Sequence, residues 1–312
     1  MKIVFFGTSR FSAEILAFLK TLPCEIVAIV TRTDKPRGRD LKCQASPVKQ
    51  KALEIFPNIP LFQPEKASTD DFCEELRAFQ ADLFLVVAYG EILRANILSL
   101  PSRACINIHT SLLPKYRGAA PIQRCLMQGE SVSGVTFMEM ALKMDAGDIL
   151  LQQEVPISSQ MDNVSLESAL LLASLERLPE FLEHFDSYYA KRQVQNEDLV
   201  TFAAKIFPED CLLDASKSAE VLQNQIRGLA PSPGAYVLLQ LGSQVKRLKI
   251  LTSRVFQEKS GREVGSLWVE NSSLYMAVGE GFLEFLEVQL EGKKAMKVEE
   301  FLRGMPKHFS IV

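Results

Sequence analysis

The sequence Ile106-Asn-Ile-His-Thr-Ser-Leu-Leu-Pro-Lys-Tyr-Arg-Gly-Ala-Ala-Pro-Ile-Gln123 decides how this chain folds and where its chemistry is expected. Residues 104–108 are typical of a short buried strand, and the prolines and glycine after it predict an irregular loop and then a helix. Asn107 and His109 are two residues apart, so both side chains leave the same face at the strand's carboxyl end. Ligands bind at that end of open α/β sheets. An amide and an imidazole there predict a polar pocket for acyl chemistry.

Composition sets the outer limits of this interpretation. The chain has 312 residues, 47% of them hydrophobic, and since single cores rarely exceed ~250 residues we expect two domains. No apolar run resembles a signal peptide or approaches the ~20 residues of a membrane helix, so we expect a cytoplasmic protein with no membrane contact. We also expect a monomer. The six cysteines are scattered without a Cys-x-x-Cys pair, which predicts reduced thiols. The net charge of −3 argues against a globally basic nucleic-acid coat, so RNA would bind through local patches.

The first half of the chain predicts a parallel sheet. Residues 2–6 and 25–30 are typical of strands, and they flank a turn at Gly7 and a helix over 10–20. A dinucleotide fingerprint needs three glycines in Gly-x-Gly-x-x-Gly, and only Gly7 is present, so we exclude NAD binding. Five or six strands alternate with helices over the first ~155 residues, including expected helices at 47–55, 69–79 and 91–100. This pattern predicts a doubly wound, Rossmann-like α/β domain.

The second half has a different pattern. A long amphipathic helix is expected over 164–189, kinked or split at Pro179. Beyond it the sequence predicts short strands separated by turns, which is typical of a small OB-like β-barrel. The expected strands cover 236–241, 248–251, 267–269, 273–278 and 282–288. We therefore expect a catalytic domain over 1–190, a linker over 191–206 and a β-barrel domain over 207–312.

A basic segment follows the second expected strand. Residues 32–51 carry seven basic side chains against two acidic ones. The basic residues are Arg32, Lys35, Arg37, Arg39, Lys42, Lys49 and Lys51. One interpretation is a solvated charged loop, and the other is a mobile arm that grips phosphates beside the pocket. Ser46 and Pro47 predict the N-cap and first position of the helix that follows.

The histidines and motifs of the chain distinguish between classes of catalytic site. The chain has three histidines, of which His184 and His308 are expected to be structural or solvated. No metal-ligand spacing such as His-Glu-x-x-His is present, so no metal is expected, and no Gly-x-Ser-x-Gly elbow supports a serine hydrolase. Asp145 can be the third member beside Asn107 and His109, because a carboxylate in a turn between neighbouring strands can reach a histidine. The other interpretation is that Asp145 only begins an Asp-Ala-Gly turn.

Several motifs together resemble the folate-dependent formyltransferases. Asn107-x-His109, the Ser111-Leu-Leu-Pro loop and Asp145-Ala-Gly-Asp are similar to the hallmark of that family. The similarity covers nearly the whole chain. It includes Phe5-Phe-Gly-Thr, Ser46-Pro-Val-Lys, Val87-Ala-Tyr-Gly, Gly118-Ala-Ala-Pro-Ile-Gln, Thr201-Phe-Ala-Ala-Lys-Ile and Gly292-Lys-Lys-Ala-Met.

The resemblance implies a reaction and its partners. A formyl group would pass from 10-formyltetrahydrofolate to the α-amine of charged methionyl initiator tRNA, for translation initiation. Asn107 and a protonated His109 would donate hydrogen bonds to the oxyanion, and Asp145 would orient the imidazole and stabilise its charge. Folate contacts would come from Ser111, Leu112, Leu113 and Pro114, with Val87 and Tyr89 beside the pterin. Contacts to tRNA would come from Arg39, Lys42, Lys205, Arg247 and Lys293.

Two other functions stay open from the sequence. One is a formyltransferase for a small amine, such as a nucleotide-linked amino sugar, which would need no grip on a long polyanion. The other is a non-catalytic RNA-binding protein that keeps the fold. The basic segment and Gly292-Lys-Lys-Ala-Met favour a tRNA substrate over the sugar, and intact Asn107, His109 and Asp145 argue against a protein without activity.

Overall fold

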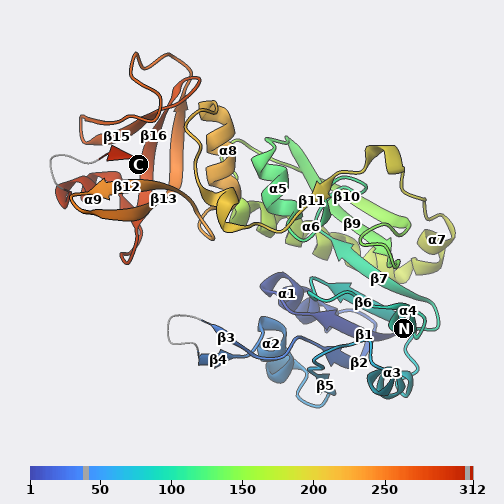
Figure 1. Cartoon of the computed structure of the whole chain (residues 1–312). Helices are drawn as coiled ribbons and strands as arrows, with labels where there is room; N and C mark the ends of the chain where they lie inside the picture. The colour runs from blue at the N-terminus through green and yellow to red at the C-terminus, as the bar shows by residue number, and fades with distance from the viewer. Residues whose placement is uncertain (38–41, 306–309, 312) are drawn as a thin grey trace. The chain divides into compact units, whose positions relative to one another are not determined.

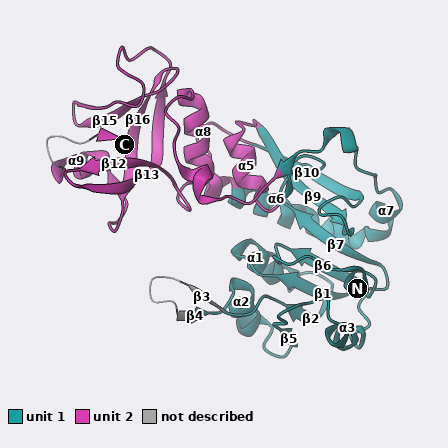
Figure 2. Cartoon of the chain, in the orientation of Figure 1, with its two compact units in different colours: residues 1–118, 132–156, 167–202 teal, residues 119–131, 157–166, 203–312 magenta. Residues whose placement is uncertain are grey.

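The computed structural model of the chain describes residues 1–37, 42–305 and 310–311. It divides into two compact units, each assembled from separate stretches of sequence (Figure 2). Unit 1 comprises residues 1–118, 132–156 and 167–202, and unit 2 comprises 119–131, 157–166 and 203–312. Both units confirm the predicted class, an α/β unit followed by a mainly antiparallel β unit.

A seven-stranded sheet forms the centre of unit 1, in the order β10-β9-β7-β6-β1-β2-β5 (Figure 1). The strands are β1 (Lys2–Gly7), β2 (Glu25–Val30), β5 (Leu61–Phe62), β6 (Leu83–Val87), β7 (Ala104–His109), β9 (Val132–Glu139) and β10 (Ile149–Pro156). The strands from β5 to β7 are parallel, as predicted, whereas β9 pairs antiparallel with β7, and β10 pairs antiparallel with β9. β7 is therefore the strand at which the direction of the sheet changes.

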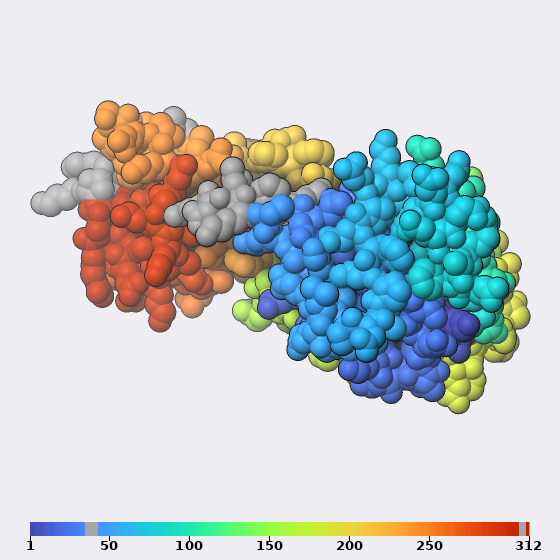
Figure 3. Space-filling model, turned by 90° about the horizontal axis from the view of Figure 1, so that it is seen from below, coloured from blue at the N-terminus to red at the C-terminus, as the bar shows by residue number. Residues whose placement is uncertain are grey.

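Helices and a shared apolar core support this sheet. The helices of unit 1 include α1 (Arg10–Leu19), α2 (Pro47–Ile55), α3 (Asp70–Arg77) and α4 (Ala95–Leu98). The predicted N-cap is confirmed, because the Ser46 hydroxyl accepts a hydrogen bond from the Lys49 amide. On one face of the sheet the Phe6 ring packs against two other aromatic rings. Its centroid lies 5.3 Å from that of Phe84, in a tilted arrangement, and 5.4 Å from that of Tyr89, edge-on. The face of unit 1 that Figure 3 shows is formed largely by N-terminal segments, drawn in blue to cyan.

The predicted helix over 91–100 is wrong in its first half. Only α4 is helical, and residues 89–94 form a loop. The Glu91 carboxylate accepts from the Ala67 amide and pairs with Arg32, and the Arg94 amide donates to the Ser68 hydroxyl. These contacts to other segments compete with the local helix.

The predicted position of the break in the long C-terminal helix of unit 1 is also wrong. α6 (Asn163–Glu183) passes through Pro179, and the break falls at His184, before α7 (Phe185–Ala190). Leu178 and Phe181 are both 0% exposed, so burial on either side of Pro179 holds the helix together.

The described parts of the basic segment include two short strands. Its flanks pair antiparallel as β3 (Lys35–Arg37) and β4 (Lys42–Gln44). At its base the Asp34 carboxylate accepts from Lys49 at 2.7 Å and from Gln63 at 2.7 Å. Arg39 lies outside the described residues.

Unit 2 is a near-barrel sheet with two packed helices. The sheet has the order β14-β15-β16-β13-β12-β18, with β17 paired to β16. Its strands are β12 (Ala235–Leu241), β13 (Gln244–Phe256), β14 (Leu267–Glu270), β15 (Ser273–Ala277), β16 (Phe282–Leu290), β17 (Met296–Lys297) and β18 (Ser310–Ile311). All five predicted strands are present. α8 (Ala219–Leu229), which the sequence analysis did not predict, and α9 (Val298–Arg303) complete the core.

α5 (Pro121–Met127) also belongs to unit 2 and packs against α8. The Arg124 guanidinium forms a two-bond ion pair with Asp210, at 2.9 and 2.8 Å. The same side chain donates to the carbonyls of Ala204 and Lys205, so it ties α5 to the chain entering the barrel.

Candidate active site

The site begins at the carboxyl end of β7. Asn107 pairs with Val86 of the parallel β6 and with Met138 of the antiparallel β9, and His109 pairs with Thr136. The Asn107 side chain is half-buried, and its amide makes no hydrogen bond to any residue that the structure describes. A buried or half-buried amide normally finds a partner. Asn107 therefore presents an unused donor and acceptor to a ligand.

The His109 ring is 6% exposed and lies between two acceptors. Its Nε2 is 3.1 Å from the Tyr116 carbonyl oxygen, and its Nδ1 is 3.9 Å from Asp145 Oδ1. The second distance is too long for a hydrogen bond but short enough for a strong interaction between a carboxylate and an imidazolium. A doubly protonated ring can face both acceptors at once.

Asp145 reaches His109 from a turn with unusual backbone geometry. Its φ is +51°, in the left-handed region that costs an ordinary residue roughly 1–2 kcal/mol. The Gly118 amide donates to Asp145 Oδ2 at 2.8 Å, which leaves Oδ1 directed at the imidazole. The structure thus brings together the three residues predicted to be catalytic.

The loop after β7 is fixed by buried hydrogen bonds. The Thr136 hydroxyl, 0% exposed, donates to the Ser111 carbonyl at 2.6 Å and accepts from the Leu113 amide at 3.2 Å. The Ser111 hydroxyl donates to the Lys115 carbonyl at 2.7 Å. The loop is therefore held in place by contacts from the protein itself.

The predicted folate-contacting residues differ in how they are placed. Leu112 and Pro114 are half-buried, whereas Ser111 and Leu113 are buried. Val87 is 0% exposed and alternates with Val86, so the structure does not bring its side chain to the face of Asn107.

Tyr89 is buried on the face that carries Asn107. Burial, and then the charge of Glu91, raises the pKa of Tyr89 to about 12. Its hydroxyl has no hydrogen-bond partner among the described residues. Ala88 and Gly90 on either side are exposed, so the backbone of this turn is open to a ligand.

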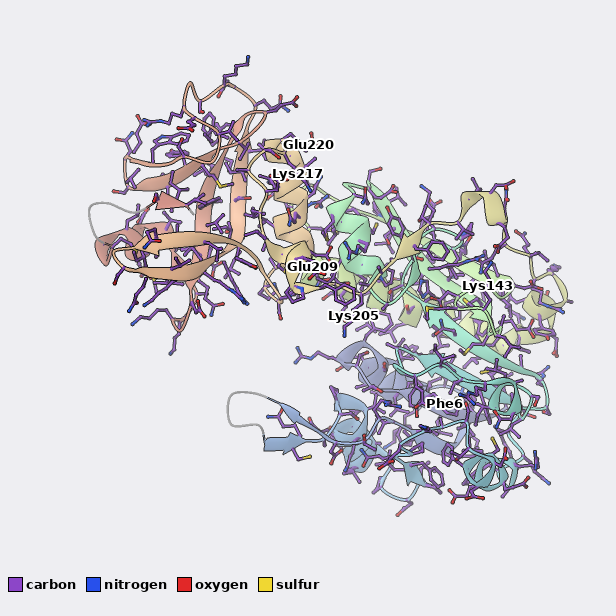
Figure 4. All side chains as sticks on the ribbon, viewed as in Figure 1. Phe6, Lys143, Lys205, Glu209, Lys217 and Glu220 are labelled. Carbon is purple, nitrogen blue, oxygen red and sulfur yellow. The ribbon has the colours of Figure 1, made fainter. Side chains whose placement is uncertain are left out.

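Sequence reasoning missed a buried polar group behind Asp145. The Arg117 guanidinium, 1% exposed, donates to the Gln195 side-chain oxygen and to Glu197. Hydrogen bonds from Arg117 and Lys143 lower the pKa of Glu197 to about 2 (Lys143 is labelled in Figure 4). Arg117 stands in the opening motif and could have been suspected, but Gln195 lies in a polar stretch expected to be linker and carried no signal.

The structure describes most of the residues that are predicted to contact tRNA. Lys205 (Figure 4), Arg247 and Lys293 are exposed, and all belong to unit 2. The Arg247 guanidinium lies 5.1 Å from the centroid of the Tyr236 ring. The Glu291 amide donates to the Arg247 carbonyl, and the Arg247 amide donates to the Glu291 carboxylate, which places Arg247 and Lys293 at the same end of the β13–β16 ladder. Lys42 belongs to β4.

Within residues 1–37, 42–305 and 310–311, no three histidine, cysteine or acidic side chains gather in a way that could hold a metal ion. No helix in the same ranges is long and apolar enough to cross a bilayer.

Comparison with known proteins gives concordant results for both halves. Residues 1–182 match a family model described as formyl transferase, and residues 205–306 match one described as formyl transferase, C-terminal domain. A methionyl-tRNA formyltransferase of Protochlamydia amoebophila is 45% identical over 99% of this chain and 96% of its own. One from Moorella thermoacetica is 40% identical over 98% of this chain and 97% of its own.

Solved structures share the fold at much lower identity. An N-formyltransferase from Helicobacter canadensis, in complex with folinic acid and dTDP-3-aminofucose, has a TM-score of 0.68 and 16% identity, covering 93% of this chain and 100% of its own. HypX from Aquifex aeolicus, in complex with tetrahydrofolic acid, has a TM-score of 0.64 and 16% identity, covering 98% of this chain and 48% of its own.

Proposed function

The chain belongs to the formyl transferase family, and from that premise we propose that it formylates methionyl initiator tRNA. The donor is 10-formyltetrahydrofolate, the acceptor is the α-amino group of the methionyl ester, and the product is N-formylmethionyl-tRNA for translation initiation. One observation carries this choice. Methionyl-tRNA formyltransferases from Protochlamydia amoebophila and Chlamydia muridarum are 45% and 38% identical to the chain across both halves, whereas two sugar N-formyltransferases of known structure share only 16% and 18%.

The residues at the end of β7 fit the donor. Bound 10-formyltetrahydrofolate supplies an activated one-carbon acyl group. The unpartnered Asn107 amide offers a hydrogen-bond donor to an acyl oxygen, and the exposed backbone at Ala88 and Gly90 together with the loop at Leu112 and Pro114 offers surface to a flat ring. Ser111, Leu113 and Tyr89, which are buried, would support these surfaces from beneath, whereas Val87 lies on the opposite face of the sheet.

Asn107 is the direct donor to the developing oxyanion. When the amine attacks the formyl carbon, negative charge grows on the formyl oxygen, and a fixed donor stabilises that charge more than it stabilises the neutral group. The amide is already in place, so no reorganisation is needed when the charge forms.

His109 acts by exchanging the hydrogen-bond acceptor of its Nε2. Its Nε2 lies 3.1 Å from the Tyr116 carbonyl oxygen, a neutral acceptor. A hydrogen bond to an anion is roughly twice as strong as one to a neutral oxygen, so the oxyanion displaces that carbonyl. Asp145 Oδ1, which lies 3.9 Å from Nδ1, would compensate positive charge on the ring.

The acceptor is held by exposed cations. Lys205, Arg247 and Lys293 of unit 2, with Arg39 and Lys42 of the basic segment, would neutralise phosphates and release counterions. The protein would act as a monomer in the cytoplasm, where initiator tRNA is charged.

Formyl transfer to charged initiator tRNA tests the proposal directly. Wild type, His109→Ala and Arg39→Ala are assayed side by side, with Lys66→Ala as a control for loss of an exposed lysine. We expect His109→Ala to be nearly inactive at saturating tRNA, and Arg39→Ala to show a raised KM for tRNA that increases further with salt. Lys66→Ala should match wild type. A wild type that binds folate but leaves the tRNA amine unformylated would refute the proposal and direct the search to small amines.

A further inference from the structure

The side-chain amide of Gln195 forms its full set of hydrogen bonds, although Gln195 lies in a stretch that the sequence predicts to be a linker. Gln195 is 5% exposed. Its Nε2 donates to the Asp145 carbonyl at 2.9 Å and to the Gly147 carbonyl at 2.7 Å. Its Oε1 accepts from Arg117 Nε at 3.0 Å and from Arg117 Nη2 at 2.7 Å. All four hydrogen-bonding positions of the amide are therefore occupied.

The same stretch also fixes the loop that contacts His109. The Thr201 hydroxyl accepts from the Tyr116 amide at 2.8 Å, and the Thr201 carbonyl accepts from the Arg117 amide at 2.9 Å. Residues 195–201 thus hold both acceptors of the His109 ring, Tyr116 through Thr201 and Asp145 through Gln195. All of these residues belong to unit 1.

Gln195 acts on the least regular part of the site. Asp145 has a φ of +51° and lies outside any helix or strand, so its carbonyl and that of Gly147 have no ladder partner. Gln195 supplies both carbonyls with a donor. Arg117, by donating twice to Oε1, fixes which end of the amide faces them, because a flipped amide would place NH₂ against the guanidinium.

We propose that Gln195 is a positioning residue for formyl transfer, which sets the Asp145 carboxylate against His109, and that Arg117 orients Gln195 for this task. The inference rests on the proposed function and adds a residue that touches neither substrate. It differs from a purely structural role in one respect: the loss should act through Asp145.

Two substitutions separate the parts of this arrangement. Gln195→Leu removes all four hydrogen bonds at similar volume. Gln195→Glu keeps an acceptor for Arg117 but places a carboxylate oxygen against the two carbonyls. If Gln195 serves only to neutralise Arg117, the glutamate variant should be as active as wild type. If it positions Asp145, both variants should lose roughly ten-fold or more in kcat, with KM for folate and tRNA nearly unchanged.

Gln193→Leu is the matched control, since Gln193 is an exposed glutamine two residues away. A double-mutant cycle with Asp145→Ala gives the decisive readout. Once Asp145 is absent, Gln195→Leu should lower kcat by less than two-fold further, because the two residues act through one interaction. Multiplicative losses would overturn the inference, and so would a Gln195→Glu variant with wild-type kcat.

A second measurement keeps the inference independent of the acceptor. The chain has three histidines, so the ring ¹⁵N resonances of His109 can be assigned with His184→Gln and His308→Gln. At fixed pH, Gln195→Leu should move the His109 resonances and Gln193→Leu should not. Should wild type fail to formylate tRNA, the proposed function falls while these spectra still decide the role of Gln195. Unmoved His109 resonances in Gln195→Leu would refute that role.

Discussion

Thr136→Val tests whether the loop after β7 is held by a single buried hydroxyl. In the structure Thr136 Oγ1 donates to the Ser111 carbonyl, accepts from the Leu113 amide and accepts from Gln152 Nε2 at 2.9 Å. Valine has nearly the same shape, so packing is kept and only the hydrogen bonds are lost. Gln152 is exposed and keeps its bond to the Leu113 carbonyl, so it can use water instead.

The expected cost follows from the two backbone groups that remain unpaired. Each buried orphan costs about 1–3 kcal/mol, and the added methyl group returns about 0.8 kcal/mol at most. The net loss should be about 3 kcal/mol, which for a domain of this size lowers Tm by roughly 6–12 °C. Because the loop carries Leu112 and Pro114, KM for the folate should rise several-fold. The kcat should change little, since neither ring partner of His109 comes from Thr136.

Thermal unfolding by circular dichroism and steady-state formyl transfer measure both effects. Ser133→Ala is the control, because Ser133 is also buried on β9 and its hydroxyl has no partner among the described residues. It should unfold at or above the wild-type temperature. A Thr136→Val protein with wild-type Tm and folate KM would refute the role assigned to this hydroxyl.

Three further predictions follow from single residues. Asn107→Ala should lower the single-turnover rate by ~10²–10³ with folate binding retained, and a loss below three-fold would remove Asn107 as the oxyanion donor. Gly147→Ala would place a Cβ 1.8 Å from the Glu139 carbonyl oxygen and should cost roughly 3 kcal/mol in urea unfolding, whereas Gly304→Ala, with no atom closer than 3.8 Å, should be near neutral. Tyr89→Phe should be at least as stable as wild type at pH 7, because the lost hydroxyl is unpaired. Since the pKa of Tyr89 is raised to about 12, wild type should lose stability between pH 10 and 12, and a phenylalanine variant with the same alkaline loss would contradict this assignment.

Much of the fold could be predicted because local signals and the final structure agree. The N-cap at Ser46 and the strands of both units follow from capping and periodicity. α8 shows the same signals, with a Ser218 cap and buried Leu222, Ile226 and Leu229 on one face, and was missed although they were present. The loop at Glu91 could not be predicted, because a carboxylate that serves Ala67 and Arg32 is indistinguishable in sequence from one that begins a helix.

Asp145 approaches His109 as predicted. The path by which the chain brings it there, however, could not be deduced from the expectation of a turn between neighbouring strands. β9 runs antiparallel to β7, so Thr136 lies opposite His109 whereas Glu139, where β9 ends, lies opposite Ile106. The turn that carries Asp145 therefore leaves the sheet three residues, or roughly 10 Å, behind the histidine.

Asp145 must return over that distance, across the face that bears Asn107, before its carboxylate can approach the ring. A nine-residue connection (140–148) is long enough to do so, and Lys143 within it pairs with Glu197, but that contact does not involve Asp145 itself. The donors that do fix it come from elsewhere: the Gly118 amide holds the carboxylate, and Gln195 holds the carbonyls of Asp145 and Gly147. A carboxylate placed by an antiparallel hairpin thus depends on a segment some fifty positions later in the chain, and this dependence is the physical reason why Gln195, which lies outside the hairpin, should control the His109 environment.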